Sequence, residues 1–173
     1  MSEIPSDWGI ANLGEITEIK ASNIDKKIVV DQKLTHVCNY SDVVTNSRIT
    51  RGVNFLRSSA TPAQIKTFSL MRDDILLTKD AEVGRVSIVE DQITDLVCGY
   101  HLYQLRTSSK EVLPRYLLYA LQSFDIQTYF KKEQTGTTIA GLARSVLEAT
   151  RVPLPPLTEQ KKIAEILSEI DNY

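Results

Sequence analysis

The chain has 173 residues, of which 42% are hydrophobic and 24% charged, and its formal net charge is −2. A chain of this length and composition buries a real core without disulfides or metal ions. A nearly neutral chain does not hold nucleic acid by bulk charge, so any DNA contact must come from a local basic surface.

Membrane-spanning, secreted, metal-binding and cofactor-dependent proteins are not expected. No stretch reaches the apolar length of a membrane span, and the first residues lack the basic and apolar regions of a secretory signal, so we expect a cytoplasmic protein. Cys38 and Cys98 lack the spacing of a metal site and are expected to be reduced. We find no Gly-rich nucleotide loop, P-loop or methyltransferase motif, so we expect no cofactor.

The N-terminal third mixes strands and loops. Trp8 is a natural anchor for the terminus, and Leu13–Ile16 is expected to lead into a first strand. From Ile24 to Ala60, short Val-rich segments alternate with loops rich in Asn, Ser, Thr and Arg. Such loops offer donors and acceptors to base edges, but ordinary surface loops have the same composition. The polar residues that we expect near base edges are Asn46, Arg48, Arg51, Asn54 and Arg57.

The middle of the chain predicts a helix and then a hairpin. Thr61 and Pro62 suit the cap and first turn of a helix. Ile75–Thr78 and Val86–Val89 are apolar enough to be strands, joined by a long charged tip at Lys79–Arg85. Arg48 to Arg85 holds seven basic and four acidic residues, which on charge alone is best interpreted as a solvated face.

A long strand is predicted from Leu96 to Arg106, and it contains His101. This histidine is a candidate general base. The sequence identifies no Ser, Cys or carboxylate partner for it, so a structural role is the preferred interpretation.

The following segment is predicted to be helical from Pro114 to Phe130, and Lys131 and Lys132 place positive charge at its C-terminal end. In Gln134–Thr138, a glycine flanked by hydroxyl side chains offers amides and short donors suited to phosphate oxygens. A short helix at 142–147 and a strand at 150–152 are expected next.

The C-terminal segment begins with Pro153, Pro155 and Pro156, which predict a stiff, extended connector. Thr158 is then expected to cap a helix. Apolar residues recur on that helix at the spacing of a coiled-coil seam, namely Ile163, Ile166, Leu167 and Ile170.

Four passages, in this order, resemble conserved regions of the specificity (S) subunits of type I restriction–modification systems. They are the IPSDW…LGEI opening, DDILLTKDAEVGRV, GTT at 136–138, and the PLPPLTEQKKIAEIL hinge and helix. The second is similar to the family's GDILxxxxGxxGR segment, except that Asp73 replaces a Gly. Since Asp also tolerates a left-handed turn, the predicted fold is unchanged.

The strand and helix signals together predict a mixed α/β fold, with a twisted, barrel-like arrangement of short strands and packed helices. The resemblance implies a DNA target recognition domain over residues 1–152, then a proline hinge and the start of a coiled-coil helix over 153–173. It further implies a non-catalytic, sequence-specific binder of double-stranded DNA. Such a subunit directs methyltransferase (M) subunits and, through them, the restriction (R) subunit.

The matched loops imply phosphate contacts by Lys79, Arg85, Lys131, Lys132, Thr137 and Thr138. Two other functions stay open: a small hydrolase using His101, and a scaffold whose helix docks another subunit without DNA. The helix stripe is covered either by its own body or by the same helix of a second chain. The prolines favour the second arrangement, and the helix's short length limits it to a weak dimer.

Overall fold

A central sheet of five strands divides the molecule into two cores. The computed structural model describes residues 5–136 and 140–171. In this sheet the strand order is β2-β9-β6-β7-β4, and every pair is antiparallel except β4 with β7. The strands are β2 (Thr17–Ala21), β4 (Arg48–Ile49), β6 (Ile75–Thr78), β7 (Val86–Val89) and β9 (Leu102–Thr107).

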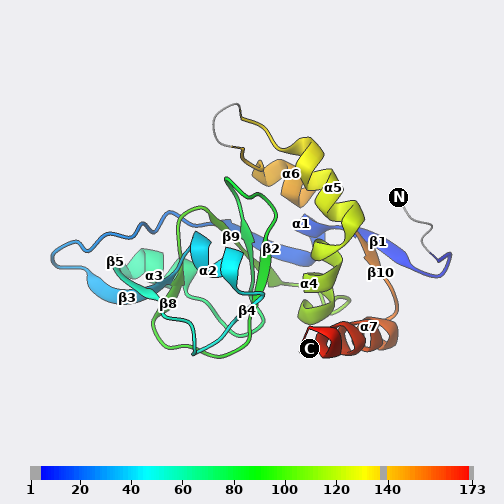
Figure 1. Cartoon of the computed structure of the whole chain (residues 1–173), viewed down its shortest axis with the longest axis horizontal. Coiled ribbons are helices and arrows are strands. Elements are labelled where there is room, and N and C mark those ends of the chain that lie inside the picture. The colour runs from blue at the N-terminus through cyan, green and yellow to red at the C-terminus, as the bar shows by residue number, and fades with distance from the viewer. Residues whose placement is uncertain (1–4, 137–139, 172–173) are drawn as a thin grey trace.

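One face of this sheet packs against helices. Because side chains alternate along a strand, Ile75, Leu77 and Leu105 point into a single core with residues of the helices. These helices lie at one end of the elongated molecule (Figure 1). They are α1 (Leu13–Ile16), α4 (Pro114–Gln122), α5 (Phe124–Glu133) and α6 (Arg144–Glu148).

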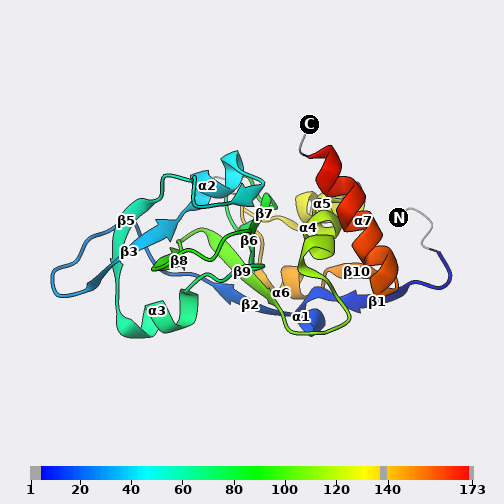
Figure 2. The ribbon, with the colours of Figure 1, turned by 90° about the horizontal axis from the view of Figure 1, so that it is seen from below.

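The other face forms a second core around Leu76, Val89 and Leu102. A three-stranded sheet of order β5-β3-β8, together with two helices, covers it. Figure 2 shows that sheet and α3 at the end opposite α4 and α7. The elements are β3 (Lys33–Cys38), β5 (Leu56–Ala60), β8 (Leu96–Cys98), α2 (Tyr40–Thr45) and α3 (Pro62–Phe68).

The two terminal strands pair with each other. β1 (Gly9–Asn12) is antiparallel to β10 (Arg151–Leu154). α7 (Leu157–Ile170) follows β10 and lies beside α4 (Figure 2). Among the described residues, no helix is long and apolar enough to cross a membrane.

Several local predictions are confirmed. The fold is mixed α/β, and β6 and β7 form the predicted antiparallel pair. The Thr61 hydroxyl accepts a hydrogen bond from the Gln64 amide at 3.2 Å, with Pro62 in the first turn of α3. Asp73 has a φ of +70°, so it adopts the left-handed conformation that aspartate was expected to tolerate at this turn.

Three larger expectations are wrong. The strands in the described part of the chain form three separate sheets and not one barrel-like sheet. The strand expected at 96–106 is broken at Gly99–His101 into β8 and β9, which belong to different sheets. Leu13–Ile16 is a short helix, because the Asn12 amide donates to Glu15 Oε2 at 2.9 Å in a capping box.

The proline connector does not project the last helix away from the body. Pro153 lies within β10, Pro156 and not Thr158 occupies the N-cap position of α7, and Gln160 is completely buried against the body. The Trp8 indole also donates to Glu159 Oε2 at 3.1 Å. Proline fixes φ, but tertiary contacts set the direction of the helix that follows.

Candidate nucleic-acid interface

The two loops expected to contact phosphate meet in the structure. The Leu142 amide donates to the Lys79 carbonyl, and the Ala81 amide donates to the Ala140 carbonyl, both at 2.9 Å. Gly141 pairs with both Asp80 and Thr135 in antiparallel bridges. The tip between β6 and β7 is therefore bound to the segment after α5.

Helix α5 brings its C-terminal lysines to the same place. Gln127 Nε2 donates to the Gly84 carbonyl at 2.8 Å, and Gly84 has a φ of +86°. Lys131 lies one turn beyond Gln127 on the same helical face, and Lys131 and Lys132 are exposed. We call residues 79–85, 131–136 and 140–141 the loop surface.

The basic side chains of the loop surface have weak partners. Arg85 Nε lies 3.1 Å from Glu82 Oε2, with 60% of the Arg85 side chain exposed. Lys79 Nζ lies 3.9 Å from Asp80 Oδ2 and 4.6 Å from the centre of the Tyr100 ring. Exposed ion pairs contribute only about 0–1 kcal/mol, so Arg85 can exchange its carboxylate for a phosphate at little cost.

Thr137 and Thr138 lie outside the described residues. The segment around them is closed by reciprocal hydrogen bonds, since the Thr135 amide donates to the Gly141 carbonyl at 2.9 Å and the Gly141 amide donates back at 2.8 Å. The described ends of this segment are thus fixed against each other beside Lys79.

The residues expected near base edges are not gathered in one place. Arg48 Nη2 donates to the Ser168 carbonyl of α7 at 3.3 Å, while Arg57 lies on β5 in the other sheet. Arg51 Nη2 donates to the Gln92 carbonyl at 3.2 Å. Asn46 caps α2, because its side-chain Nδ2 donates to the Asp42 carbonyl at 2.8 Å. Asn54 is exposed.

His101 has a carboxylate partner that the sequence did not reveal. Its Nδ1 lies 2.8 Å from Asp80 Oδ2, across 21 positions of sequence. The described residues that line the pocket around His101 include no serine, threonine or cysteine. The histidine is oriented by a nearby carboxylate, which is the partner that the hydrolase alternative requires.

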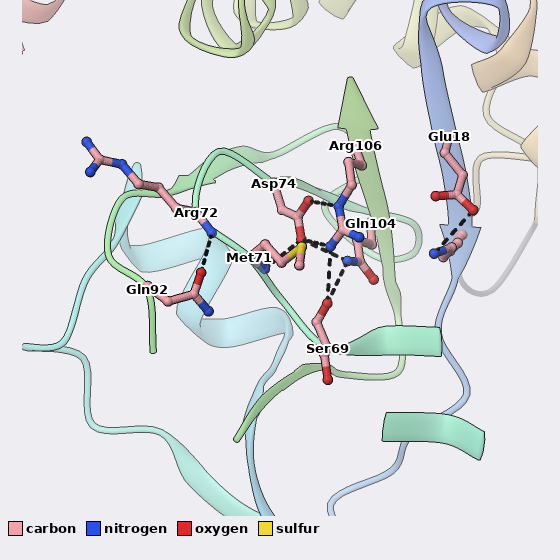
Figure 3. Close-up of polar contacts among 9 residues, drawn as sticks. Glu18, Ser69, Met71, Arg72, Asp74, Gln92, Gln104 and Arg106 are labelled. Atoms are coloured by element: carbon pink, nitrogen blue, oxygen red, sulfur yellow. Dashed lines mark hydrogen bonds and ion pairs between the residues drawn. The ribbon is translucent and has the colours of Figure 1, made fainter. Parts of the chain in front are cut away.

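A buried acid holds the turn that leads into β6 (Figure 3). Asp74 is 1% exposed and accepts from Arg106 Nε and Nη2, both at 2.7 Å, and from Gln104 Nε2 at 2.9 Å. The Met71 amide also donates to it at 2.8 Å. The hydrogen bond with Asp74 raises the pKa of the Arg106 guanidinium. This cluster fixes the start of β6, and Lys79 follows the other end of that strand.

The expected subunit-contact stripe is divided between two faces of α7. Ile163 and Leu167 are half-buried, whereas Ile166 and Ile170 are 59% and 62% exposed. The face that rests on the body contains Gln160 and Ala164. Within the described ranges, no cluster of three or more His, Cys, Asp or Glu residues could hold a metal ion.

A family model and individual proteins that resemble this sequence point to the same family. A family model described as "Type I restriction modification DNA specificity domain" matches residues 5–173. The putative type I restriction enzyme MjaX specificity subunit of Methanocaldococcus jannaschii is 30% identical over 99% of this chain and 41% of its own length. The MjaVIII specificity subunit of the same organism is 29% identical over 98% of this chain and 37% of its own length.

Solved structures share the fold. The HsdS subunit from Thermoanaerobacter tengcongensis superposes with a TM-score of 0.69 at 20% identity, covering 99% of this chain and 39% of that one. A chain from work on complex assembly and conformational transition of the type I R-M system gives 0.72, also at 20% identity, covering 99% of this chain and 40% of that one. This chain thus spans about 40% of the length of these relatives. It belongs to the family of type I restriction–modification DNA specificity domains.

Proposed function

We propose that this chain binds double-stranded DNA in a sequence-specific manner through the loop surface, as a recognition (S) subunit or half-subunit of a type I restriction–modification complex. The observation that carries the proposal is the joining of two separate loops, at 79–85 and 135–141, with the lysines of α5. Cationic side chains gathered in this way suit a phosphate backbone. We place the protein in the cytoplasm, with its DNA.

Within this proposal, residues 1–152 are the target recognition domain and 153–173 the hinge and the start of a conserved helix. Phosphates are contacted from the loop surface and the adjoining hydroxyl side chains, and base edges from the polar loops of the N-terminal third. The first set is Lys79, Arg85, Lys131, Lys132, Thr137 and Thr138, and the second is Asn46, Arg48, Arg51, Asn54 and Arg57.

Salt dependence tests the loop surface. Lys79→Ala and Arg85→Ala are each expected to weaken binding to all duplexes alike and to flatten the slope of log K against log salt by about one unit. Lys33→Ala is the matched control, because Lys33 lies on β3 and pairs at 2.6 Å with Asp95, outside the loop surface. Fluorescence anisotropy with a labelled duplex measures the slope. Unchanged slopes in both variants would remove these two residues from the interface, and a wild type that binds no DNA would leave the scaffold and the His101 hydrolase as alternatives.

The exposed face of α7 supports a second part of the proposal, which is pairing with the same helix of another copy. Ile166 and Ile170 remain open to solvent although α7 rests on its own body. Burying such a side chain contributes about 1.5–3 kcal/mol, so two per helix support a weak antiparallel dimer. The dimer would then offer two recognition domains to M subunits and, through them, to the R subunit.

Sedimentation at several concentrations tests this pairing. The wild type is expected to show a concentration-dependent rise in mass that Ile166→Asp and Ile170→Asp abolish, without change in melting temperature. Lys161→Asp is the control, since 72% of this neighbouring side chain is exposed. A wild type that is monomeric at every concentration contradicts the pairing.

A further inference from the structure

A pocket beside the loop surface is lined by aromatic and polar side chains. Its volume is about 370 Å³, within the range of about 300–1,000 Å³ found for small-ligand sites. Asn39, Tyr40, Asp80, Tyr100 and His101 contribute to its wall. Asp80 follows Lys79 directly, so the pocket adjoins a residue that we assign to phosphate contact.

The turn that forms one wall of this pocket is held rigidly. A Cβ on Gly99 would lie 2.7 Å from the Cys38 carbonyl oxygen, so this close approach requires glycine. The Gly99 amide donates to that carbonyl at 2.8 Å, and the Tyr100 amide donates to the Ile24 carbonyl at 2.7 Å. The Lys79 amide also donates to the His101 carbonyl at 2.8 Å, so backbone hydrogen bonds hold all three residues of the turn.

Two residues that line this pocket have a strained backbone conformation. In the described part of the chain, the non-glycine residues with positive φ include three aspartates, which tolerate that conformation. The other two are Ala81, with a φ of +62°, and His101, with a φ of +69°, and both line this pocket. Strained residues of this kind cost about 1–3 kcal/mol each and cluster at functional sites, because the surrounding contacts hold them in place.

The side chains around the turn suit a nucleobase. The His101 Nδ1–H donates to Asp80 Oδ2, which fixes the imidazole ring and leaves Nε2 to bond with a ligand. The Tyr40 hydroxyl accepts from the Glu82 amide at 3.1 Å, so its ring is also fixed. Tyr100 is 45% exposed and meets the His101 ring edge-on, with centroids 4.3 Å apart. Aromatic faces stack on bases, and Nε2 can bond to a base edge.

We infer that this pocket receives the edge of one DNA base and that His101 is a specificity-determining residue, with Asp80 as its positioning residue. The inference rests on the proposed DNA binding. It assigns base recognition to a turn between β8 and β9 that is separate from the Asn- and Arg-rich loops named above. Phosphate contact at Lys79 then sets the register in which the neighbouring His101 meets its base.

The test is selection of bound sequences from a randomised duplex pool, using the full chain. His101→Asn is the main variant, because Asn tolerates positive φ and keeps the turn. We expect it to lose about tenfold of the wild-type preference at one base pair, with the salt slope unchanged. Asp80→Ala should weaken the preference at the same base pair. His36→Gln is the matched control, since this exposed histidine on β3 does not line the pocket, and it should select the wild-type motif.

The outcomes separate this inference from the proposal on which it depends. If the wild type selects no motif, both the proposed sequence-specific DNA binding and the inference about the pocket are wrong. A wild type that selects a motif which His101→Asn reproduces, with equal preference at every position, overturns the pocket alone. A loss of affinity for all sequences together with a flatter salt slope would make His101 a phosphate contact, which also overturns it. If His101→Asn melts early, Tyr100→Leu takes its place under the same criteria.

Discussion

Replacing Gln160 by alanine is expected to release α7 from the body and to lower the free energy of unfolding by about 2–4 kcal/mol. Gln160 is fully buried and makes three hydrogen bonds to backbone groups. Its Nε2 donates to the Glu111 carbonyl at 2.7 Å and to the Pro155 carbonyl at 2.9 Å, and its Oε1 accepts from the Leu113 amide at 2.9 Å. Each bond contributes about 0.5–1.5 kcal/mol, and the variant leaves a buried amide and two carbonyls without partners.

Two optical signals measure this effect in urea. Trp8 is the only tryptophan and donates to Glu159 on α7, so its fluorescence reports whether the helix is docked. Far-ultraviolet circular dichroism reports the whole body. In the Gln160→Ala variant the fluorescence transition should come at lower urea than the dichroism transition, whereas Lys161→Ala should behave as the wild type. Equal midpoints for wild type and Gln160→Ala would refute the assignment of Gln160 as the anchor of α7.

A glutamate at position 160 adds a pH dependence with a definite sign. Its carboxylate would face the Glu111 and Pro155 carbonyls with no proton to donate, so burial and these acceptors would raise its pKa in the folded state. A folded state that binds the proton more tightly is destabilised as the pH rises. Relative to the wild type, Gln160→Glu should lose stability as the pH rises above about 4.3, the ordinary value for glutamate. A loss that is the same at every pH would contradict this account.

Three further predictions concern the supports of the fold. Asp74→Ala, which leaves Arg106 and several donors without their acceptor, should cost about 3 kcal/mol in urea unfolding, and a cost below about 1 kcal/mol would contradict its role. Burial raises the pKa of the Cys38 and Cys98 thiols, so alkylation should follow unfolding, and stability should fall as the pH rises above about 8.5; rapid alkylation of the native protein would disagree. Gly99→Ala should lower the melting temperature, because its Cβ would clash with a backbone carbonyl, and an unchanged melting curve would show that the turn adapts.

Local signals predicted the local structure of this chain well. Ile75–Leu77 is an uninterrupted apolar run, as expected of a strand buried on both faces, and all four residues of β6 are buried. Thr61 and Pro62 carry their helix-start signal within a few residues. Lys79 and Arg85 were identified as candidates because a motif surrounds them, although their contact with DNA stays a prediction.

Contacts between residues distant in sequence explain the structural features that local sequence patterns did not predict. Gly99 separates β8 from β9 because it touches the Cys38 backbone, which no local pattern reveals. Gln160 looks like a surface residue of an amphipathic helix, yet two of its three partners, Glu111 and Leu113, lie almost fifty residues earlier. Asp80 and His101 meet across 21 positions, so the histidine appeared to have no acidic neighbour.

The pairing of β1 with β10 brings the two ends of this body together. Gly9 lies opposite Leu154, so the chain enters and leaves the body through adjacent strands at the same edge. Domains whose ends are close together tolerate insertion into another chain and circular permutation. Two such bodies can therefore be joined in series, or one exchanged for another, without threading a connection across either body.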